Sequence, residues 1–251
     1  MRQLLPCPID DRDAGSDEVD PLVLYGADDR PGPDDRPWVL VNMVASADGG
    51  TAVDGRSGAL GGPADKRVFA AVRAVADVVL VAAGTVRAER YGPPRPSDEV
   101  RHQRRARGQA EAPRLAIVTR SLDLDLDAPL FADAEQPPFV VVSADVDPTR
   151  RSAAAERAQV LVCGEREVSL TLALQALHAE GARVVLVEGG PSLNGQLVAA
   201  DLVDELCLTV SPLLVAGSSA RVAHGDRSIA TRMRVRRILE DDGLLFLRYT
   251  R

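Results

Sequence analysis

The feature that most constrains the fold is a buried strand that runs directly into two glycines and a helix. The hydrophobic run at 183–187 stops at the segment 188–190, Glu-Gly-Gly, and a helix is expected over 191–200. This junction presents backbone N–H groups and the positive end of a helix dipole at the carboxyl end of the strand. It predicts either an anion site, for example for a nucleotide pyrophosphate, or a turn whose glycines serve only close packing. In the first case Glu188 would face a second ligand.

The same alternation of strands and helices continues along the chain. Strands are expected at 38–44, 78–82, 115–119, 139–143, 160–163, 183–187 and 203–210, helices from Pro63, after Gly84 and at 148–158, 169–180 and 191–200, and a final antiparallel pair near 233–240 and 244–250. This order predicts an α/β fold with a doubly wound, mostly parallel sheet and a C-terminal antiparallel hairpin. Ligands then bind beyond the carboxyl ends of the strands, where the glycine bends after 78–82 and 183–187 could share one cofactor.

The charge of the chain is uneven and suggests where the domain begins. Residues 1–37 hold ten acidic residues against four arginines, out of a net charge of −7. We expect a solvated or loosely docked acidic arm over 1–37 and one domain over 38–251. Residues 87–114 carry eight arginines against four acids and are expected to form a solvated loop, in which single arginines could still bind anions.

Composition also argues against several classes of protein. A global basic surface for nucleic acid is absent. No apolar run approaches the roughly 20 residues of a membrane span, and the N-terminus lacks the hydrophobic core of a signal peptide. We therefore expect a cytoplasmic protein with no nucleic-acid or membrane partner.

The inventory of ionisable residues narrows the chemistry. The three histidines have no serine or cysteine motif nearby and Lys66, the one lysine, lies inside a helix, so triad and Schiff-base mechanisms are improbable. No cluster has metal-ligand spacing, so no metal is predicted. Carboxylates at loop–strand junctions, Asp48 and Glu188, remain beside the glycine bends. Such a site suits a reaction whose difficult step belongs to a bound cofactor, as in hydride transfer. An equal alternative for Asp48 is a turn residue that bonds its own backbone.

Five linked motifs resemble a known family. They occur in its order at 42–49 (Asn-Met-Val-Ala-Ser-Ala-Asp-Gly), 57–58, 76–86, 187–193, and 202–206 with 211–212. Over roughly residues 38–250 the chain resembles the pyrimidine reductases of riboflavin biosynthesis, the RibD C-terminal domain family related to dihydrofolate reductase. The resemblance implies a dihydrofolate-reductase-like fold and NADPH as cofactor. It also implies reduction of 5-amino-6-(5-phosphoribosylamino)uracil, a phosphorylated pyrimidine, to the ribitylamino product.

The resemblance also implies site residues. Positions that match the family's dinucleotide contacts are Ala45, Gly84, Thr85, Glu89, Ser121, Gly189, Gly190, Pro191, Ser192, Leu193 and Asn194. Positions that match its substrate contacts are Ser57, Arg73, Arg95 and Glu188. Arg73 and Arg95 would hold the substrate phosphate, because a guanidinium binds two oxygens at once. Arg120, beside Ser121, could meet the 2′-phosphate that distinguishes NADPH from NADH.

Candidate catalytic roles fall to Asp48 and Glu188. Asp48 would orient or protonate reacting groups, and Glu188 would hold the ribityl hydroxyls. A homodimer is implied by the resemblance, with the strand at 203–210 and its neighbours as the candidate interface.

The chain also departs from the family pattern. It lacks the sequence signature of the zinc deaminase domain that many members carry. Ala59 replaces the usual aromatic residue, and the loop at 84–95 is rich in proline and arginine. Two alternatives therefore stay open. The first is a reductase of dihydrofolate or another pterin-like ring, and the second is a nucleotide-binding regulatory or structural protein without catalysis, suggested by the shortage of histidine and lysine.

Overall fold

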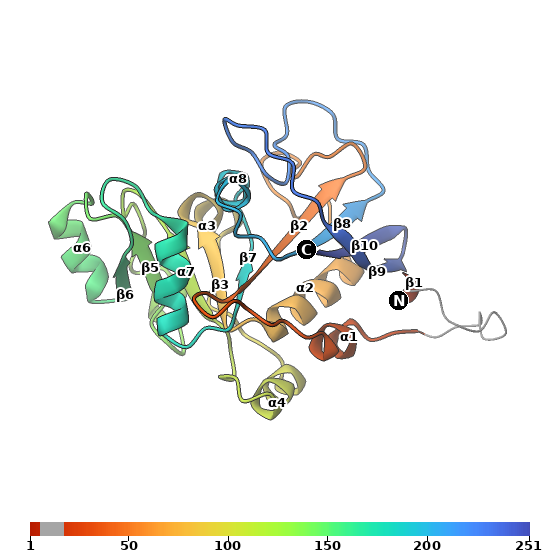
Figure 1. Cartoon of the computed structure of the whole chain (residues 1–251), viewed down its shortest axis with the longest axis horizontal. Coiled ribbons are helices and arrows are strands. Elements are labelled where there is room, and N and C mark those ends of the chain that lie inside the picture. Colours follow the sequence, from red (N-terminus) through yellow and green to blue (C-terminus); the bar gives the residue numbers. More distant parts are fainter. Residues whose placement is uncertain (6–17) are drawn as a thin grey trace.

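The protein is one sheet with helices on both faces, seen in a computed structural model that describes residues 1–5 and 18–251 (Figure 1). Its strands are β1 (Arg2–Leu5), β2 (Trp38–Ser46), β3 (Val78–Ala82), β4 (Arg114–Val118), β5 (Phe139–Val142), β6 (Gln159–Val162), β7 (Val184–Val187), β8 (Glu205–Ser211), β9 (Arg234–Asp241) and β10 (Leu244–Thr250). Its helices are α1 (Pro21–Ala27), α2 (Pro63–Val75), α3 (Ala83–Glu89), α4 (Asp98–Ala106), α5 (Pro129–Ala132), α6 (Pro148–Ala155), α7 (Leu170–Ala179) and α8 (Pro191–Ala199).

The sheet is mostly parallel, with antiparallel strands at one end. The strand order is β1-β9-β10-β8-β2-β7-β3-β4-β5-β6. The strands from β8 to β6 in this order run parallel, whereas β10 is antiparallel to both β8 and β9, and β1 is antiparallel to β9. The predicted α/β class, the mostly parallel sheet and the C-terminal antiparallel hairpin are therefore confirmed.

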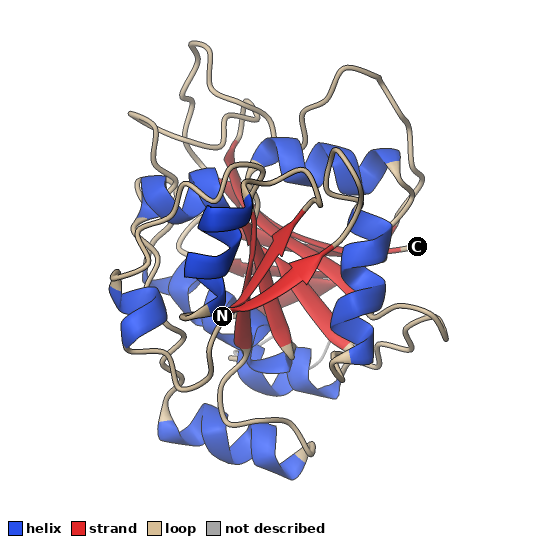
Figure 2. Cartoon of the chain, turned by 90° about the vertical axis from the view of Figure 1, so that its left-hand side faces the viewer, coloured by secondary structure: helices blue, strands red, loops and turns tan. Residues whose placement is uncertain are grey.

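Each central strand contributes to two cores because its successive side chains point to opposite faces of the sheet. In β2, Leu40 packs in the core under α2, while Val39 and Val41 pack in the core under α7 and α8. Helices cover both faces of the strands in Figure 2. Burial on both faces explains why these strands are continuous hydrophobic runs in the sequence, and it makes the sheet doubly wound, as predicted.

β8 lies inside the sheet rather than at its edge. It is hydrogen-bonded to β2 on one side and to β10 on the other. A partner subunit therefore cannot extend the sheet at β8, and a dimer contact in this region would use side chains on the sheet faces. Among the described residues, the outermost strands are β1 and β6.

The described part of the N-terminal segment is docked on the domain. β1 pairs with β9, and Tyr25 of α1 is 1% exposed. Arg30 pairs with Glu205, which is fully buried and also accepts hydrogen bonds from Arg248 and Trp38. The expectation of a solvated or loosely docked arm is wrong for these residues, because buried carboxylates of the sheet need its arginines as partners. Residues 6–17 of the expected arm lie outside the described residues.

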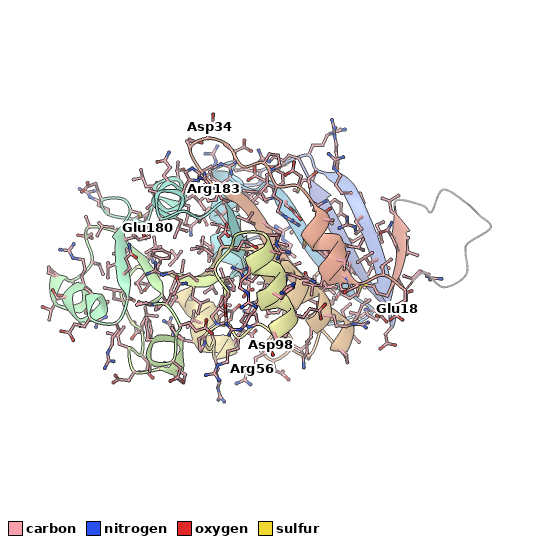
Figure 3. The ribbon with its side chains drawn as sticks, turned by 90° about the horizontal axis from the view of Figure 1, so that it is seen from below. Glu18, Asp34, Arg56, Asp98, Glu180 and Arg183 are labelled. Atoms are coloured by element: carbon pink, nitrogen blue, oxygen red, sulfur yellow. The ribbon has the colours of Figure 1, made fainter. Side chains whose placement is uncertain are left out.

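The arginine-rich insertion contains a helix, α4, instead of only the expected solvated loop. α4 projects at the bottom of Figure 1 and faces the viewer in Figure 3, where its first residue, Asp98, is labelled. Arg104 of α4 is 0% exposed. Its guanidinium donates to the carbonyls of Ala74 (3.0 Å) and Ala76 (2.6 Å), at the C-terminal end of α2. A sequence rule that treats arginine as a surface residue misses this contact.

Candidate active site

A cleft lies at the carboxyl ends of the central strands, between α2, α3 and the start of α8. It encloses about 870 Å³ and is lined by both glycine bends, the one after β3 and the one after β7. The bends touch each other: the N–H of Ala82 donates to the carbonyl of Gly189 at 2.9 Å. The prediction that the two bends share one cleft is therefore confirmed.

The glycines of these bends differ in what a side chain would meet there. Gly189 has φ of +86°, a conformation that side chains rarely adopt, and its peptide bond to Gly190 is cis. A Cβ on Gly190 would come within 2.9 Å of the Thr85 hydroxyl oxygen. A Cβ on Gly84 would meet nothing within 4 Å. Gly84 therefore faces open space in the cleft, which leaves room for a ligand against its backbone.

Three polar side chains that line the cleft form a cluster around the buried Glu188. Arg73 of α2 holds Glu188 in a two-pronged pair, with Nε to Oε1 at 2.6 Å and Nη2 to Oε2 at 2.7 Å. The Tyr91 hydroxyl donates to Oε2 of Glu188 at 2.6 Å. The guanidinium lies 4.2 Å from the centre of the Phe69 ring, one helical turn earlier. Burial, and then the Glu188 carboxylate, raise the pKa of Tyr91 well above its usual value, so the hydroxyl stays a donor.

Ser57 and Glu89 meet at the mouth of the cleft. The Glu89 carboxylate accepts from the backbone N–H of Ser57 at 2.9 Å and from its hydroxyl at 3.0 Å. The pair fixes the glycine-rich loop 51–62 against α3. Resemblance assigns these residues to different ligands, and the structure places them side by side in the lining of one cleft.

Three charged residues in the cleft were missed by the sequence analysis. Asp65, Lys66 and Arg90 all line it. Burial raises the pKa of Asp65, and the hydroxyl of Thr209 in β8 donates to its Oδ1 at 2.8 Å. Within the described residues, neither Lys66 nor Arg90 forms an ion pair. In the sequence, Asp65 and Lys66 look like ordinary residues of a helical first turn, so only the fold identifies them.

Asp48 lies outside the cleft lining and does not have the predicted surroundings of a proton donor. Its side chain is exposed and accepts from the Ser46 hydroxyl at 2.5 Å and from the backbone N–H groups of Val215 (3.1 Å) and Ala216 (2.7 Å). The bonds from Ser46 and from these N–H groups lower its pKa to about 2. The structure favours the alternative interpretation, in which Asp48 organises turns.

Other predicted site residues are also outside the cleft lining. Arg95 has a side chain 71% exposed, 3.7 Å from Asp133. Arg120 and Ser121 follow β4 and are exposed, and the Ser121 carbonyl accepts from Arg150. The resemblance suggested Arg95 and Ser121, and its place beside Ser121 suggested Arg120; a place in the chain does not by itself put a side chain in the lining.

Further implied residues support the lining from behind. Ala45 is buried in β2 beside the lining residue Val44. Asn194 of α8 is 1% exposed, and its Nδ2 donates to the carbonyl of Val222 at 2.7 Å. Its neighbours Pro191, Ser192 and Leu193 line the cleft at the start of α8.

The segment 213–224 crosses the rim of the cleft and holds its two sides. Ser219 accepts from the backbone N–H groups of Thr51 and Ala52, both at 3.1 Å. At its other end, the N–H of His224 donates to the carbonyl of Pro191 at 3.0 Å. Segment 213–224 therefore connects the loop after β2 to the start of α8 through hydrogen bonds.

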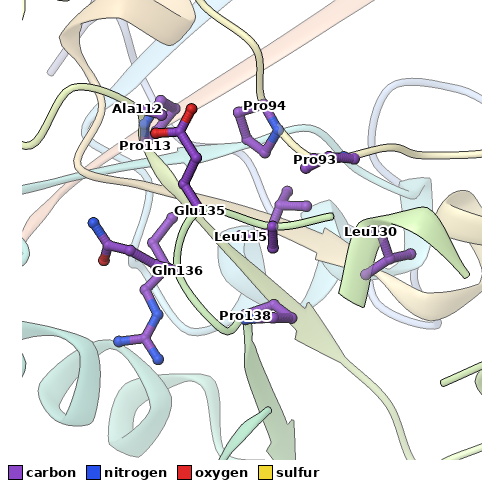
Figure 4. A pocket seen from close by; sticks show the side chains of 11 residues that line it. Pro93, Pro94, Ala112, Pro113, Leu115, Leu130, Glu135, Gln136 and Pro138 are labelled. Atoms are coloured by element: carbon purple, nitrogen blue, oxygen red, sulfur yellow. The ribbon is translucent and has the colours of Figure 1, made fainter. Parts of the chain in front are cut away.

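A second hollow is too small for a substrate. It lies beneath Pro93 and Pro94 and next to Glu135 and Gln136, and holds about 20 Å³, room for about one water molecule (Figure 4). Within the described residues, no three metal-ligating side chains come together. Nor, in the part of the chain described, does any helix combine the length and hydrophobicity needed to cross a bilayer.

Comparisons with known proteins agree with this architecture. The family model described as the RibD C-terminal domain matches residues 37–245. A 2,5-diamino-6-ribosylamino-4(3H)-pyrimidinone 5′-phosphate reductase of Archaeoglobus fulgidus is 30% identical over 204 residues, covering 81% of this chain and 93% of that protein. The reductase of the same name from Methanothermobacter thermautotrophicus is 30% identical over 186 residues, covering 74% of this chain and 82% of that protein.

A solved structure gives the same answer for the fold. A pyrimidine reductase-like protein of Corynebacterium diphtheriae superposes with a TM-score of 0.79 at 26% identity, covering 92% of this chain and 98% of that chain. The chain therefore belongs to the RibD C-terminal domain family, the pyrimidine reductases of riboflavin biosynthesis.

Proposed function

We propose that this protein uses NADPH to reduce the ribosylamino group of a phosphorylated pyrimidine to a ribitylamino group. The observation that carries the proposal is the meeting of two glycine bends and the Arg73–Glu188–Tyr91 cluster in one cleft of about 870 Å³. A cleft of this size can hold a dinucleotide next to a second ligand.

The cofactor end of the cleft fits a dinucleotide. The open space at Gly84 lets a ligand approach the backbone, and the start of α8 offers N–H groups that have no partner inside the helix. Gly84, Thr85 and the segment 190–193 would hold NADPH. When bound, NADPH would supply the hydride. Arg120 and Ser121, at the end of the next strand, stay candidates for its 2′-phosphate.

The other end of the cleft fits a phosphorylated sugar. Glu188, fixed by Arg73 and Tyr91, presents a carboxylate to sugar hydroxyls, and Ser57 lies at the mouth. We assign the phosphate to Arg73 with Lys66 and Arg90, because these cations line the cleft and Arg95 does not. Among the described residues, Lys66 and Arg90 have no competing carboxylate.

Two pyrimidines compete as substrate. They are 5-amino-6-(5-phosphoribosylamino)uracil and the 2,5-diamino-pyrimidinone, which differ in the oxygen or nitrogen at ring carbon 2. The names of the relatives favour the diaminopyrimidinone, and they favour either pyrimidine over a pterin. Absorbance at 340 nm follows NADPH oxidation with each pyrimidine and with dihydrofolate. Turnover of dihydrofolate alone would overturn the proposal.

A glycine variant tests the cofactor assignment without turnover. In Gly84→Val the new side chain occupies space that is open in this structure, so the fold is kept and the dinucleotide is displaced. We expect NADPH to bind at least about tenfold more weakly, a loss of about 1.4 kcal/mol. Gly225→Val is the matched control, because a Cβ there also meets nothing within 4 Å and Gly225 does not line the cleft. Equal NADPH affinity in the two variants would remove the assignment.

A further inference from the structure

We propose that Asp65 is the proton donor of the reaction, a role that rests on the proposed function. Asp65 lies in the first turn of α2 and lines the same cleft as Glu188 and the glycine bends. Neither the motifs nor the resemblance pointed to it. The cleft lining holds three carboxylates, Asp65, Glu89 and Glu188, and their surroundings differ.

The reduction needs one proton as well as one hydride. The sugar carbon that bears the nitrogen gains the hydride, and its bond to the ring oxygen breaks. The electron pair of that bond stays on the oxygen, which must take a proton to become the new hydroxyl of the ribityl chain. NADPH is oxidised to NADP⁺, the sugar carbon is reduced, and the donor regains its proton from water. A positioned acid in the cleft is therefore required.

Two of the three carboxylates in the cleft lining are committed to other donors. Glu188 is held by the guanidinium of Arg73 and by the Tyr91 hydroxyl. Both of its carboxylate oxygens therefore already accept from fixed donors. Glu89 accepts two hydrogen bonds from Ser57. Each of these two carboxylates therefore already serves as an acceptor for a neighbouring side chain.

Asp65 has the opposite surroundings. Its Oδ1 accepts one hydrogen bond, from the Thr209 hydroxyl at 2.8 Å. Its Oδ2 lies close to Gly61, where an added Cβ would come within 2.5 Å of it. Among the described residues, Asp65 forms no ion pair. A half-buried carboxyl without a cationic partner holds its proton more tightly than one in water.

The neighbouring charges do not reverse this effect. On α2, Lys66 is exposed, Arg67 pairs with Asp241 of β9, and Arg73 pairs with Glu188. On α3 and directly after it, Glu89 and Arg90 line the same cleft, and β8 offers the neutral Thr209. The start of the helix favours a negative charge. Burial outweighs both this and the Thr209 bond, because the pKa of Asp65 is raised.

The competing interpretation is that Asp65 only ties α2 to β8 through Thr209. Two variants separate the interpretations. Asp65→Asn keeps an oxygen for the Thr209 hydroxyl but cannot donate an acidic proton. Thr209→Val removes the tie but leaves the acid, and the loss of its hydrogen bond raises the pKa of Asp65 further.

The measurements are kcat, KM, NADPH affinity and the pH dependence of kcat, with the better of the two pyrimidines as substrate. In the wild type, kcat falls as pH rises through the pKa of Asp65, because the acid must be protonated. For Asp65→Asn we expect kcat to fall about 10²–10⁴-fold, the usual contribution of a positioned acid, with NADPH affinity unchanged and this pH limb lost. For Thr209→Val we expect substantial kcat and a limb moved to higher pH.

The outcomes are distinct. If Asp65→Asn keeps more than a tenth of kcat, or keeps the pH limb, Asp65 is not the donor although the reductase function stands. If Thr209→Val loses as much activity as Asp65→Asn with the limb unmoved, the tie is what matters and the proposal is wrong. If the wild type turns over neither pyrimidine, the proposed function itself fails and this role fails with it.

Discussion

Arg104 offers a test of how the insertion supports the active site. Its guanidinium donates to the carbonyls of Ala74, Ala76 and Ala110 at 2.6–3.0 Å, and Ala74 alone also accepts from Arg107, at 2.8 Å. In Arg104→Met the apolar stem stays packed, but the carbonyl of Ala76, which is 0% exposed, loses this donor, whereas exposed Ala110 can bond water instead. An unsatisfied buried acceptor costs about 1–3 kcal/mol.

Arg104→Met also removes a buried cation, and the desolvation cost that this cation carries in the wild type offsets part of the loss. Burial lowers the pKa of Arg104 to about 10, which leaves the group charged at neutral pH but at some expense. We therefore expect Arg104→Met to lower the free energy of unfolding by about 1–2 kcal/mol. It should also raise KM, because the capped end of α2 carries Arg73.

Urea unfolding at neutral pH measures the change in Arg104→Met, with an unchanged m-value as evidence that the same surface is exposed. Arg105→Met is the matched control. It lies one residue away on α4, is 54% exposed and pairs with Glu111, so its loss should cost less than about 0.5 kcal/mol. If the free energies of unfolding of the two variants differ by less than about 0.5 kcal/mol, capping by Arg104 contributes little and the prediction is wrong.

Two further predictions concern the carboxylates. Glu188→Gln leaves the guanidinium of Arg73, 27% exposed, without its charge partner. We expect the free energy of unfolding in urea to fall by about 2–3 kcal/mol, less than the about 3–5 kcal/mol for a fully buried pair. No loss of stability would mean that the pair is not formed in solution. For Asp48, whose pKa falls from 3.8 to about 2 on folding, stability is present above about pH 4 and lost as pH falls through about 2. Asp48→Asn should therefore be less stable than the wild type at about pH 5 and equal to it at about pH 1, and a difference that persists there would contradict this origin.

The fold was largely predictable because its signals are local. Strands buried on both faces are continuous hydrophobic runs, and the bends at Gly84 and Gly190 mark where two of them end. Since parallel strands end at the same edge of a sheet, the shared cleft followed from topology alone.

The remaining site depends on contacts that no local pattern encodes. Arg104 is buried, whereas the neighbouring Arg105 and Arg107 are exposed, and the carbonyls of Ala74 and Ala76 that it meets lie about 30 residues earlier in the chain. Asp65 is distinguished from an ordinary helix-start acid only by Thr209, more than 140 residues later. Asp48 and Arg95 show the reverse, because a motif or a resemblance suggested a role for two side chains that are exposed and are not part of the cleft lining.

The ion pairs of the N-terminal segment change what counts as the folding unit. The family match begins at residue 37, yet Asp28 pairs with Arg237, Arg30 with Glu205 and Arg36 with Asp204. A shortened protein cut at the family boundary would leave Glu205 inside the sheet with one counter-ion fewer and the Arg237 side chain, 13% exposed, without one. The unit that folds with its buried charges paired therefore begins earlier in the chain than the family match.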